Sequence, residues 1–188
     1  MPLSADTCLR FVLATTAMSQ YRQLRTQQYL RQAEGYLELE MPQQALAVLE
    51  RVGERAERSV QVLYLQGEAL RNMERYAAAL VPLKRAARLA PKNVHVALAL
   101  GWCYKRTDQL PKAITALERG LRVDPDDPLL LYNLACYHSL ARHKQQALDY
   151  LSRALDQDAS YLELVPSESD FDPLRSDSDF QSLTSIIV

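Results

Sequence analysis

The chain has 188 residues, of which 48% are hydrophobic and 24% are charged, and its formal net charge is -1. That length suffices for one domain with a buried core, and so balanced a charge argues against the concentrated basic surface that nucleic-acid binding requires. The five glycines form no phosphate-binding motif, and their scarcity beside frequent Ala, Leu, Arg, Gln and Glu predicts an all-α protein.

Residues 1–25 predict an N-terminal helix that covers the open face of the helices that follow. Their longest apolar stretch, Cys8 to Met18, has 11 residues, whereas a membrane-spanning helix needs roughly 20. The residues before it include Asp6 but no Lys or Arg, and Arg10 interrupts the stretch, unlike a secretory signal. We therefore expect neither a transmembrane segment nor secretion.

Four stretches of the chain align on one another at a period of about 34 residues, and no insertion separates them. They begin at Thr26, Val60, Val94 and Pro128. The eighth position of each copy is small, the twentieth is alanine and the twenty-fourth is leucine. These positions are Ala33, Gly67, Gly101 and Ala135; Ala45, Ala79, Ala113 and Ala147; and Leu49, Leu83, Leu117 and Leu151. Such spacing indicates one helical unit stacked on itself.

The period and its pattern of residues resemble the tetratricopeptide repeat family. The third copy matches best, with Leu100-Gly101, Tyr104, Ala113, Leu117 and Pro125 at the signature positions. Over residues 26–160, the resemblance implies an all-α fold: a right-handed superhelical solenoid of antiparallel helix pairs. The expected units are an N-terminal helical extension at 1–25, repeats at 26–59, 60–93, 94–127 and 128–161, and a capping segment at 162–188.

Each copy predicts two helices, which in the third run from Val94 to about Thr107 and from Pro111 to about Val123. Pro111 suits the first turn of a helix, where no N–H is needed. We expect the small eighth residues to face the alanines at position twenty, because helix backbones must approach closely there. Pro82 lies deeper in a second helix and predicts a slight bend.

The C-terminal residues predict the cap of the array. Residues 161–165 have the pattern of a further first helix that Pro166 stops, and Ser176 to about Ile186 predicts a last short helix. Its expected buried side is Phe171, Leu174, Phe180 and Leu183. Between Asp156 and Asp172 the chain has six carboxylates and no Lys or Arg. This run predicts solvated surface, or alternatively a segment that folds back on a basic groove and inhibits it.

The resemblance implies that the first helices line a concave groove that receives a peptide or a helix of a partner. Trp102, the only tryptophan, falls on this face with Tyr64 and Tyr132 one repeat to each side, and buried aromatic side chains carry much of the energy of interfaces. The alternatives are a tryptophan in the core and cations on a solvated face. The predicted partner-binding residues are Tyr64, Glu68, Arg71, Asn72, His95, Leu98, Trp102, Lys105, Arg106 and Tyr132.

No catalytic site, cofactor or metal is predicted. Cys136 and His138 are two residues apart on a helix and point to different sides, and His143 falls in a predicted turn. Cys8, Cys103 and Cys136 form no C-x-x-C pair, which indicates a reducing compartment such as the cytoplasm. The clamp for a C-terminal carboxylate known in this family needs Lys and Asn at positions that this chain fills with other residues.

The sequence therefore predicts a non-enzymatic protein-interaction module: an adaptor, scaffold or assembly factor that binds a peptide or helix in its concave groove. Two alternatives stay open. One is a dedicated chaperone for secretion or membrane-complex subunits, with homodimerisation through the N-terminal helix. The other is a structural subunit whose groove is permanently filled within a larger assembly.

Overall fold

A computed structural model describes residues 5–53 and 58–185, with side chains from residue 18 onward. Over this range the chain consists of helices joined by short turns, without strands. The α-helices are α1 (Ala5–Glu38), α2 (Pro42–Glu50), α3 (Val60–Asn72), α4 (Tyr76–Leu89), α5 (Val94–Lys105), α6 (Leu110–Leu121), α7 (Pro128–Leu140), α8 (Lys144–Gln157) and α9 (Ser178–Ser185), and two 3₁₀ helices are η2 (Ala159–Ser167) and η3 (Ser169–Leu174).

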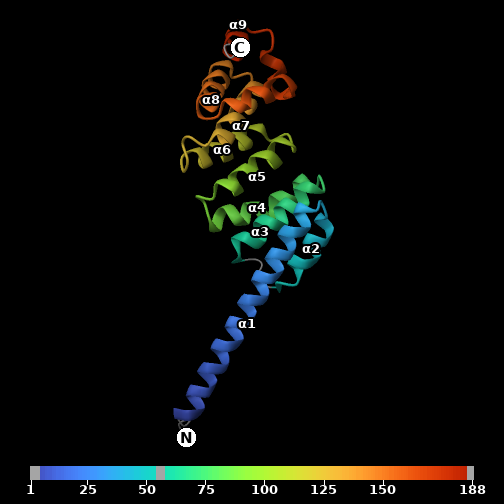
Figure 1. Ribbon diagram of the computed structural model, residues 1–188, viewed down its shortest axis with the longest axis vertical. Helices are drawn as coiled ribbons and strands as arrows, with labels where there is room; N and C mark the ends of the chain where they lie inside the picture. Colours follow the sequence, from blue (N-terminus) through green and yellow to red (C-terminus); the bar gives the residue numbers. More distant parts are fainter. Residues whose placement is uncertain (1–4, 54–57, 186–188) are drawn as a thin grey trace.

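The helices pair in chain order and the pairs stack into an elongated array (Figure 1). The first helices of the four repeats are the last part of α1, then α3, α5 and α7, and the second helices are α2, α4, α6 and α8. The buried residues form three clusters along the array, each drawing on neighbouring pairs. Apolar burial is thus shared between adjacent hairpins, as expected of a solenoid.

In repeats two and three, the glycine at position eight of the first helix packs directly against the second helix. A Cβ atom placed on Gly67 would lie 2.5 Å from Leu83 Cγ, and one on Gly101 would lie 2.7 Å from Leu117 Cδ2. The nearest part of Ala113 is its backbone oxygen, 3.6 Å away. The predicted close approach is present, but it is the leucine of position twenty-four rather than the alanine of position twenty that fills the space.

Local signals place the helix ends close to the predicted ones. Pro111 lies in the first turn of α6, as predicted, whereas α5 and α6 end two residues earlier than expected. Asp127 caps α7, because its Oδ1 accepts a hydrogen bond of 2.9 Å from the backbone N–H of Leu130. The helix α4 continues through Pro82, which is buried.

The turn inside each hairpin is also periodic, in a way that the sequence did not reveal. Glu40, Glu74, Asp108 and Arg142 occupy the same position in successive repeats, and each has a φ of 55–61°. The N–H of Arg75 donates to the carbonyl of Leu70 at 2.9 Å, and the same bond recurs in the other three hairpins. This is the Schellman end of a helix, with a non-glycine residue at the left-handed position.

At the C-terminal end, the 3₁₀ helix η2 replaces the further first helix expected at residues 161–165, whereas α9 lies within the range of the predicted last short helix. The helix η2 continues past Pro166, so the proline does not end it. The predicted buried side is confirmed: Phe171, Leu174 and Phe180 are buried, and Leu183 packs against the same cluster. Residues 186–188, which include the end of the predicted last helix, lie outside the described part of the chain.

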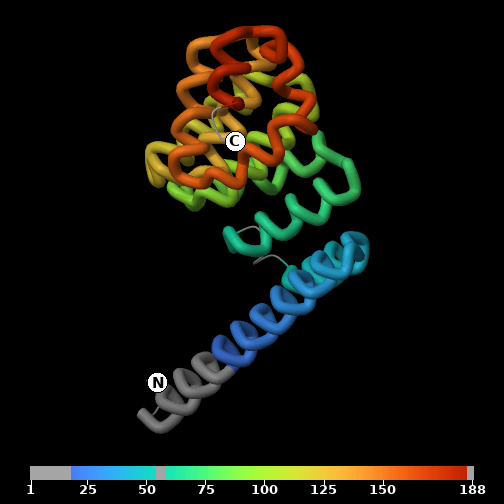
Figure 2. The backbone as a smooth tube through the Cα atoms, turned by 45° about the horizontal axis from the view of Figure 1, so that its top comes forward, coloured from blue at the N-terminus to red at the C-terminus, as the bar shows by residue number. Residues whose placement is uncertain are grey.

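At the other end, the N-terminal extension is continuous with the first helix of repeat one. Residues 18–25 of α1 extend away from the stack (Figures 1 and 2), and Met18, Tyr21 and Leu24 are exposed. In this region α1 therefore does not cover the open face of the first repeat, as we had expected. Within the described residues, no helix has both the length and the apolar character that crossing a bilayer requires.

Replacing Gly67 by alanine tests the close approach. Leu83 is fully buried and cannot move aside, so we expect Gly67→Ala to lower the free energy of unfolding by ~1–3 kcal/mol. Gly35→Ala is the matched control, because a Cβ there meets no atom within 4 Å, and it should stabilise the helix by ~0.5–1 kcal/mol. Urea denaturation followed by circular dichroism measures both. Equal effects of the two changes would contradict the packing described.

Candidate functional site: a groove along α3, α5 and α7

A groove of about 440 Å³ runs across the first helices of repeats two to four. Its exposed large apolar side chains include Trp102 on α5, Leu129 on α7 and Leu164 of the C-terminal segment, and Leu98 on α5 also lines it. The remaining lining residues are Tyr64, Glu68, Arg71, His95, Ala99, Tyr132, Asn133, Tyr161 and Glu168. Seven of the ten predicted partner-binding residues thus lie together here: Tyr64, Glu68, Arg71, His95, Leu98, Trp102 and Tyr132.

Trp102 lies at the surface of this groove and not in the core. Its exposed fraction is 38%, and the Nζ of Lys105, one turn further along α5, lies 5.5 Å from the centre of its ring. On the preceding first helix, α3, the ring of Tyr64 lies 6.4 Å from the ring of His95. The groove therefore offers the flat face of an indole beside aliphatic side chains, which suits an apolar side chain of a ligand.

The charges of the groove are paired more fully than the sequence indicated. Arg71 binds Glu68 through two contacts, Nη2 to Oε2 at 2.6 Å and Nε to Oε1 at 3.1 Å. Lys105, another of the predicted partner-binding residues, forms an ion pair with Asp170 of the C-terminal segment. Of the three cations among the predicted partner-binding residues, Arg71 and Lys105 therefore already have carboxylate partners.

The C-terminal segment closes one end of the groove. Tyr132 is only 6% exposed, because Tyr161 and Phe171 cover it at ring distances of 5.0 and 5.7 Å. Burial raises the pKa of Tyr132 well above its ordinary range. This tyrosine therefore forms part of the cap interface, and the accessible aromatic surface belongs to Trp102, Tyr64 and Tyr161.

Asn72 and Arg106 lie apart from the groove. Asn72 lines a separate hollow with Glu40 and Gln43 between the first two repeats. The guanidinium of Arg106 packs over the ring of Tyr76, 5.0 Å from its centre. The sequence does not predict that Tyr161, Leu164 and Glu168 line the groove, since they lie at or beyond the end of the last repeat, where no periodic position marks them.

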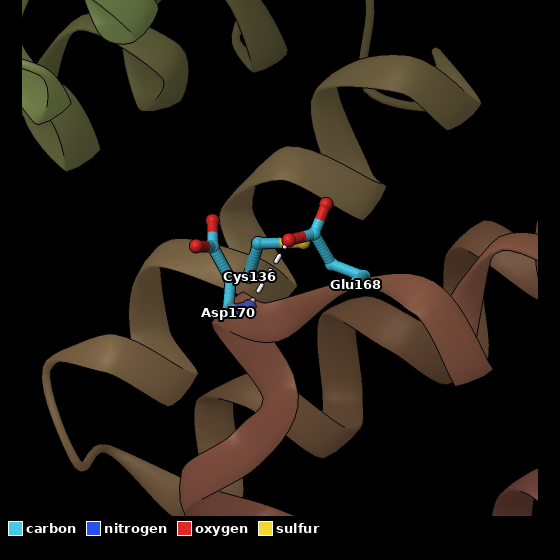
Figure 3. Close-up of side chains that lie close together, drawn as sticks. All are labelled: Cys136, Glu168 and Asp170. Carbon is cyan, nitrogen blue, oxygen red and sulfur yellow. Dashed lines mark hydrogen bonds between the residues drawn. The ribbon is translucent and has the colours of Figure 1, made fainter.

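Behind the closed end of the groove, Cys136, Glu168 and Asp170 bring three potential metal-ligand atoms within 4.8 Å of one another (Figure 3). Glu168 Oε1 accepts the N–H of Asp170 at 3.0 Å, and the Asp170 carboxylate also binds Lys105. Burial, together with the two carboxylates, raises the pKa of the Cys136 thiol far above its ordinary value. A protonated thiol and two partnered carboxylates anchor the cap on α7 more readily than they hold a metal ion.

His138 and His143 form a pair that sequence spacing did not predict. Their Nδ1 atoms are 3.2 Å apart, and the ring of His138 stacks on Tyr150 at 5.3 Å. His143 lies in the turn before α8, as predicted, and the turn brings it back onto the end of α7. Burial, and secondly His143, lowers the pKa of His138 below its ordinary 6.5, while Glu118 opposes the shift.

Comparison with known proteins identifies the class of this fold. Residues 70–135 match the sequence model of the tetratricopeptide repeat family. A crystal structure of MamA superposes with a TM-score of 0.68 at 18% identity, covering 87% of this chain and 99% of that one. MamA from Desulfovibrio magneticus RS-1, residues 41 to the end, gives 0.69 at 18%, covering 86% and 94%.

YrrB, described as a TPR protein with an unusual peptide-binding site, gives a TM-score of 0.67 at 17% identity over 84% of this chain and 87% of its own. The chain matches no curated protein sequence. At such identities the likeness establishes the fold. The predicted resemblance and all-α solenoid are confirmed: residues 70–135 match the tetratricopeptide repeat model, and the chain has the fold of the tetratricopeptide repeat proteins it superposes on.

The ion pair between the cap and α5 can be tested by Asp170→Asn. The Asp170 side chain is 9% exposed and that of Lys105 is 19% exposed, so leaving the ammonium without its partner should cost ~1–3 kcal/mol of unfolding free energy. Asp172→Asn is the control, because Asp172 forms an exposed pair with Arg175 at 2.8 Å and should cost at most ~0.5 kcal/mol. Urea denaturation measures both, and equal losses would argue against the role given to Asp170.

The histidine pair predicts a pH dependence of stability. Because the pKa of His138 is lowered by folding, the unfolded chain binds its proton more readily. Neutral His138 therefore contributes to stability above the pKa of 6.5 that it has in the unfolded chain. This contribution is lost as the pH falls from 6.5 through the lower pKa of the folded state. Denaturation at about pH 7.5 and about pH 5.5 should show a smaller loss in His138→Phe than in the wild type. Identical losses would assign the dependence to other groups.

Proposed function

We propose that the protein recruits a partner by binding a short peptide, or one face of a helix, in the groove along α3, α5 and α7. The observation that carries this proposal is the position of Trp102, an accessible indole beside Leu98 and Leu129 in a groove of about 440 Å³. Apolar surface with a few polar groups at its edge is the usual composition of a ligand site. The role is that of an adaptor, scaffold or assembly factor.

The electrostatics of the groove favour a ligand whose main anchor is apolar. Glu68 and Arg71 neutralise each other at the N-terminal end, and Lys105 is neutralised by Asp170. Glu168 and His95 also line the groove and offer polar atoms for hydrogen bonds. We infer that the ligand supplies one or two large apolar side chains and binds through backbone and polar contacts at the rim.

The buried state of the described cysteines supports a reducing compartment such as the cytoplasm. Cys103 and Cys136 are both free and buried, and burial raises the pKa of Cys103 to about 11. A thiol with so high a pKa is a poor nucleophile at neutral pH, so neither residue is suited to disulfide exchange.

The test uses Trp102 both as the site and as the reporter. Peptides are selected from a random display library against the wild-type protein, and their affinity is measured by anisotropy and by Trp102 fluorescence, to which no other tryptophan contributes. We expect Trp102→Ala to weaken binding by at least ~10-fold, as loss of a central aromatic anchor does. Leu89→Ala, an exposed apolar side chain at the end of α4, is the control and should change the affinity less than ~2-fold.

Two results would contradict the proposal. Selected peptides that bind Trp102→Ala as tightly as the wild type would place their site elsewhere on the array. Peptides that bind without altering the emission of Trp102 would lead to the same conclusion.

A further inference from the structure

A second pocket, of about 420 Å³, is lined by residues of the second helices α4 and α6 and of α5 between them; Figure 1 shows where these helices lie in the array. Its floor is one side of α5, formed by Ala97, Leu100 and Tyr104, which are three and four residues apart. The groove residues Leu98 and Trp102 belong to another side of the same helix. The two sites therefore share α5 but have no lining residue in common.

The pocket exists because three positions are alanine in this part of the array. Ala87, Ala97 and Ala116 line it, and one repeat later the corresponding residues are Leu121, Leu131 and Tyr150. Between α6 and α8, Tyr150 stacks on His138, the counterpart of Tyr104. A large side chain thus fills in the fourth repeat the space that Ala116 leaves open in the third.

Four cations surround the pocket: Lys84 and Arg88 from α4, and Lys112 and Arg119 from α6. No Asp or Glu is among its described lining residues, and no ion pair joins any of the four to a carboxylate within the described part of the chain. Four like charges around one hollow repel one another and lower the cost of bringing in negative charge. The groove, by contrast, has the carboxylates of Glu68 and Glu168 in its lining.

Two of these cations cover the ring of Tyr104 at the bottom of the pocket. The Nζ atoms of Lys84 and Lys112 lie 5.6 and 5.9 Å from the centre of the ring. Both distances are within the range of cation–π contacts, which hold an ammonium group beside an aromatic face. The lysine head groups are thus held over an apolar floor, where an anion that also carries an apolar group can reach both.

We propose that this pocket is a second binding site, which takes an acidic peptide segment with a large apolar side chain between carboxylates. The apolar side chain occupies the space over Ala97, Leu100 and Ala116, and the flanking carboxylates bind the lysines and arginines of the rim. The volume lies within the range of small ligand sites, which suits one side chain. A nucleic acid would present phosphates but no aliphatic or benzyl group to the floor.

The experiment uses the full chain and a fluorescein-labelled probe peptide, Glu-Glu-Phe-Glu-Glu, in low salt. Two control probes replace Phe by Gly, or all four Glu by Lys. Two variants copy the fourth repeat: Ala116→Tyr fills the floor, and Thr115→Asp introduces the carboxylate of Asp149 at the exposed rim. Trp102→Ala and Arg122→Glu, an exposed cation outside the lining, serve as matched control variants.

We expect the Phe-containing acidic probe to bind the wild type at least ~10-fold more tightly than either control probe, and salt to weaken it. Ala116→Tyr and Thr115→Asp should each weaken binding of the acidic probe by ~5-fold or more. The tyrosine fills the pocket, and the added carboxylate repels the carboxylates of the probe. Trp102→Ala and Arg122→Glu should leave that binding unchanged. Thr115→Asp keeps the test valid if Ala116→Tyr disturbs folding, which circular dichroism reports.

Four results would overturn the proposal: no binding of the acidic probe, equal binding of the Gly probe, equal binding by Thr115→Asp, or tighter binding of a single-stranded oligonucleotide of the same charge. Loss of probe binding in Trp102→Ala would assign the probe to the groove instead. Failure of the groove proposal leaves this result untouched, because Ala116→Tyr and Thr115→Asp change only the second pocket.

Discussion

The contact between position eight and position twenty-four of each repeat is the constraint on which the structure depends. In repeats two and three the first helix has no side chain at this point, and Leu83 and Leu117 fill the space against its backbone. The separation of the two helices of a hairpin follows from that contact. Because a small residue at position eight and a leucine at position twenty-four are buried in every repeat, successive hairpins have similar shapes, and equivalent residues lie side by side along the array. The line from Tyr64 through Leu98 to Tyr132, with Trp102 one turn further along α5 than Leu98, is one result.

The repeating part of the fold could be predicted because each of its determinants is local or periodic. Pro111 and Asp127 mark the starts of helices within a few residues, and the leucines at position twenty-four indicate where the second helix packs on the first. The turns were less visible, because Glu74 and its equivalents adopt a positive φ that glycine usually signals. The cap could not be predicted in detail, since it occurs once in the chain and its short 3₁₀ helices show no repeated sequence pattern.

In the candidate groove too, the residues of the repeats could be predicted and those of the cap could not. Periodicity gives the direction in which a side chain points, so Tyr64, Leu98 and Trp102 were placed together correctly. It says nothing about a segment outside the repeats that packs on the same face. Lys105 and Asp170 are 65 residues apart in sequence, and their pairing, like the covering of Tyr132 by Tyr161 and Phe171, depends on a tertiary contact. The acidic C-terminal run folds back onto one end of the groove and limits its length, rather than forming only solvated surface.

The positions that differ between repeats determine the binding surfaces, since the positions that all repeats share are buried where the hairpins stack. Ala116 and Tyr150 occupy equivalent places on α6 and α8, yet one leaves a pocket and the other fills it. Position eleven is Leu70, Tyr104 and His138 in repeats two to four. The ring of Tyr104 lies beside Lys84 and Lys112, whereas His138 stacks on Tyr150. Neither Ala116 nor Tyr150 is needed for the solenoid to form, because the third and fourth hairpins stack on their neighbours in the same way. A hollow that persists where a tyrosine would fit, ringed by cations without carboxylates, is therefore a feature of this surface and not a consequence of the fold.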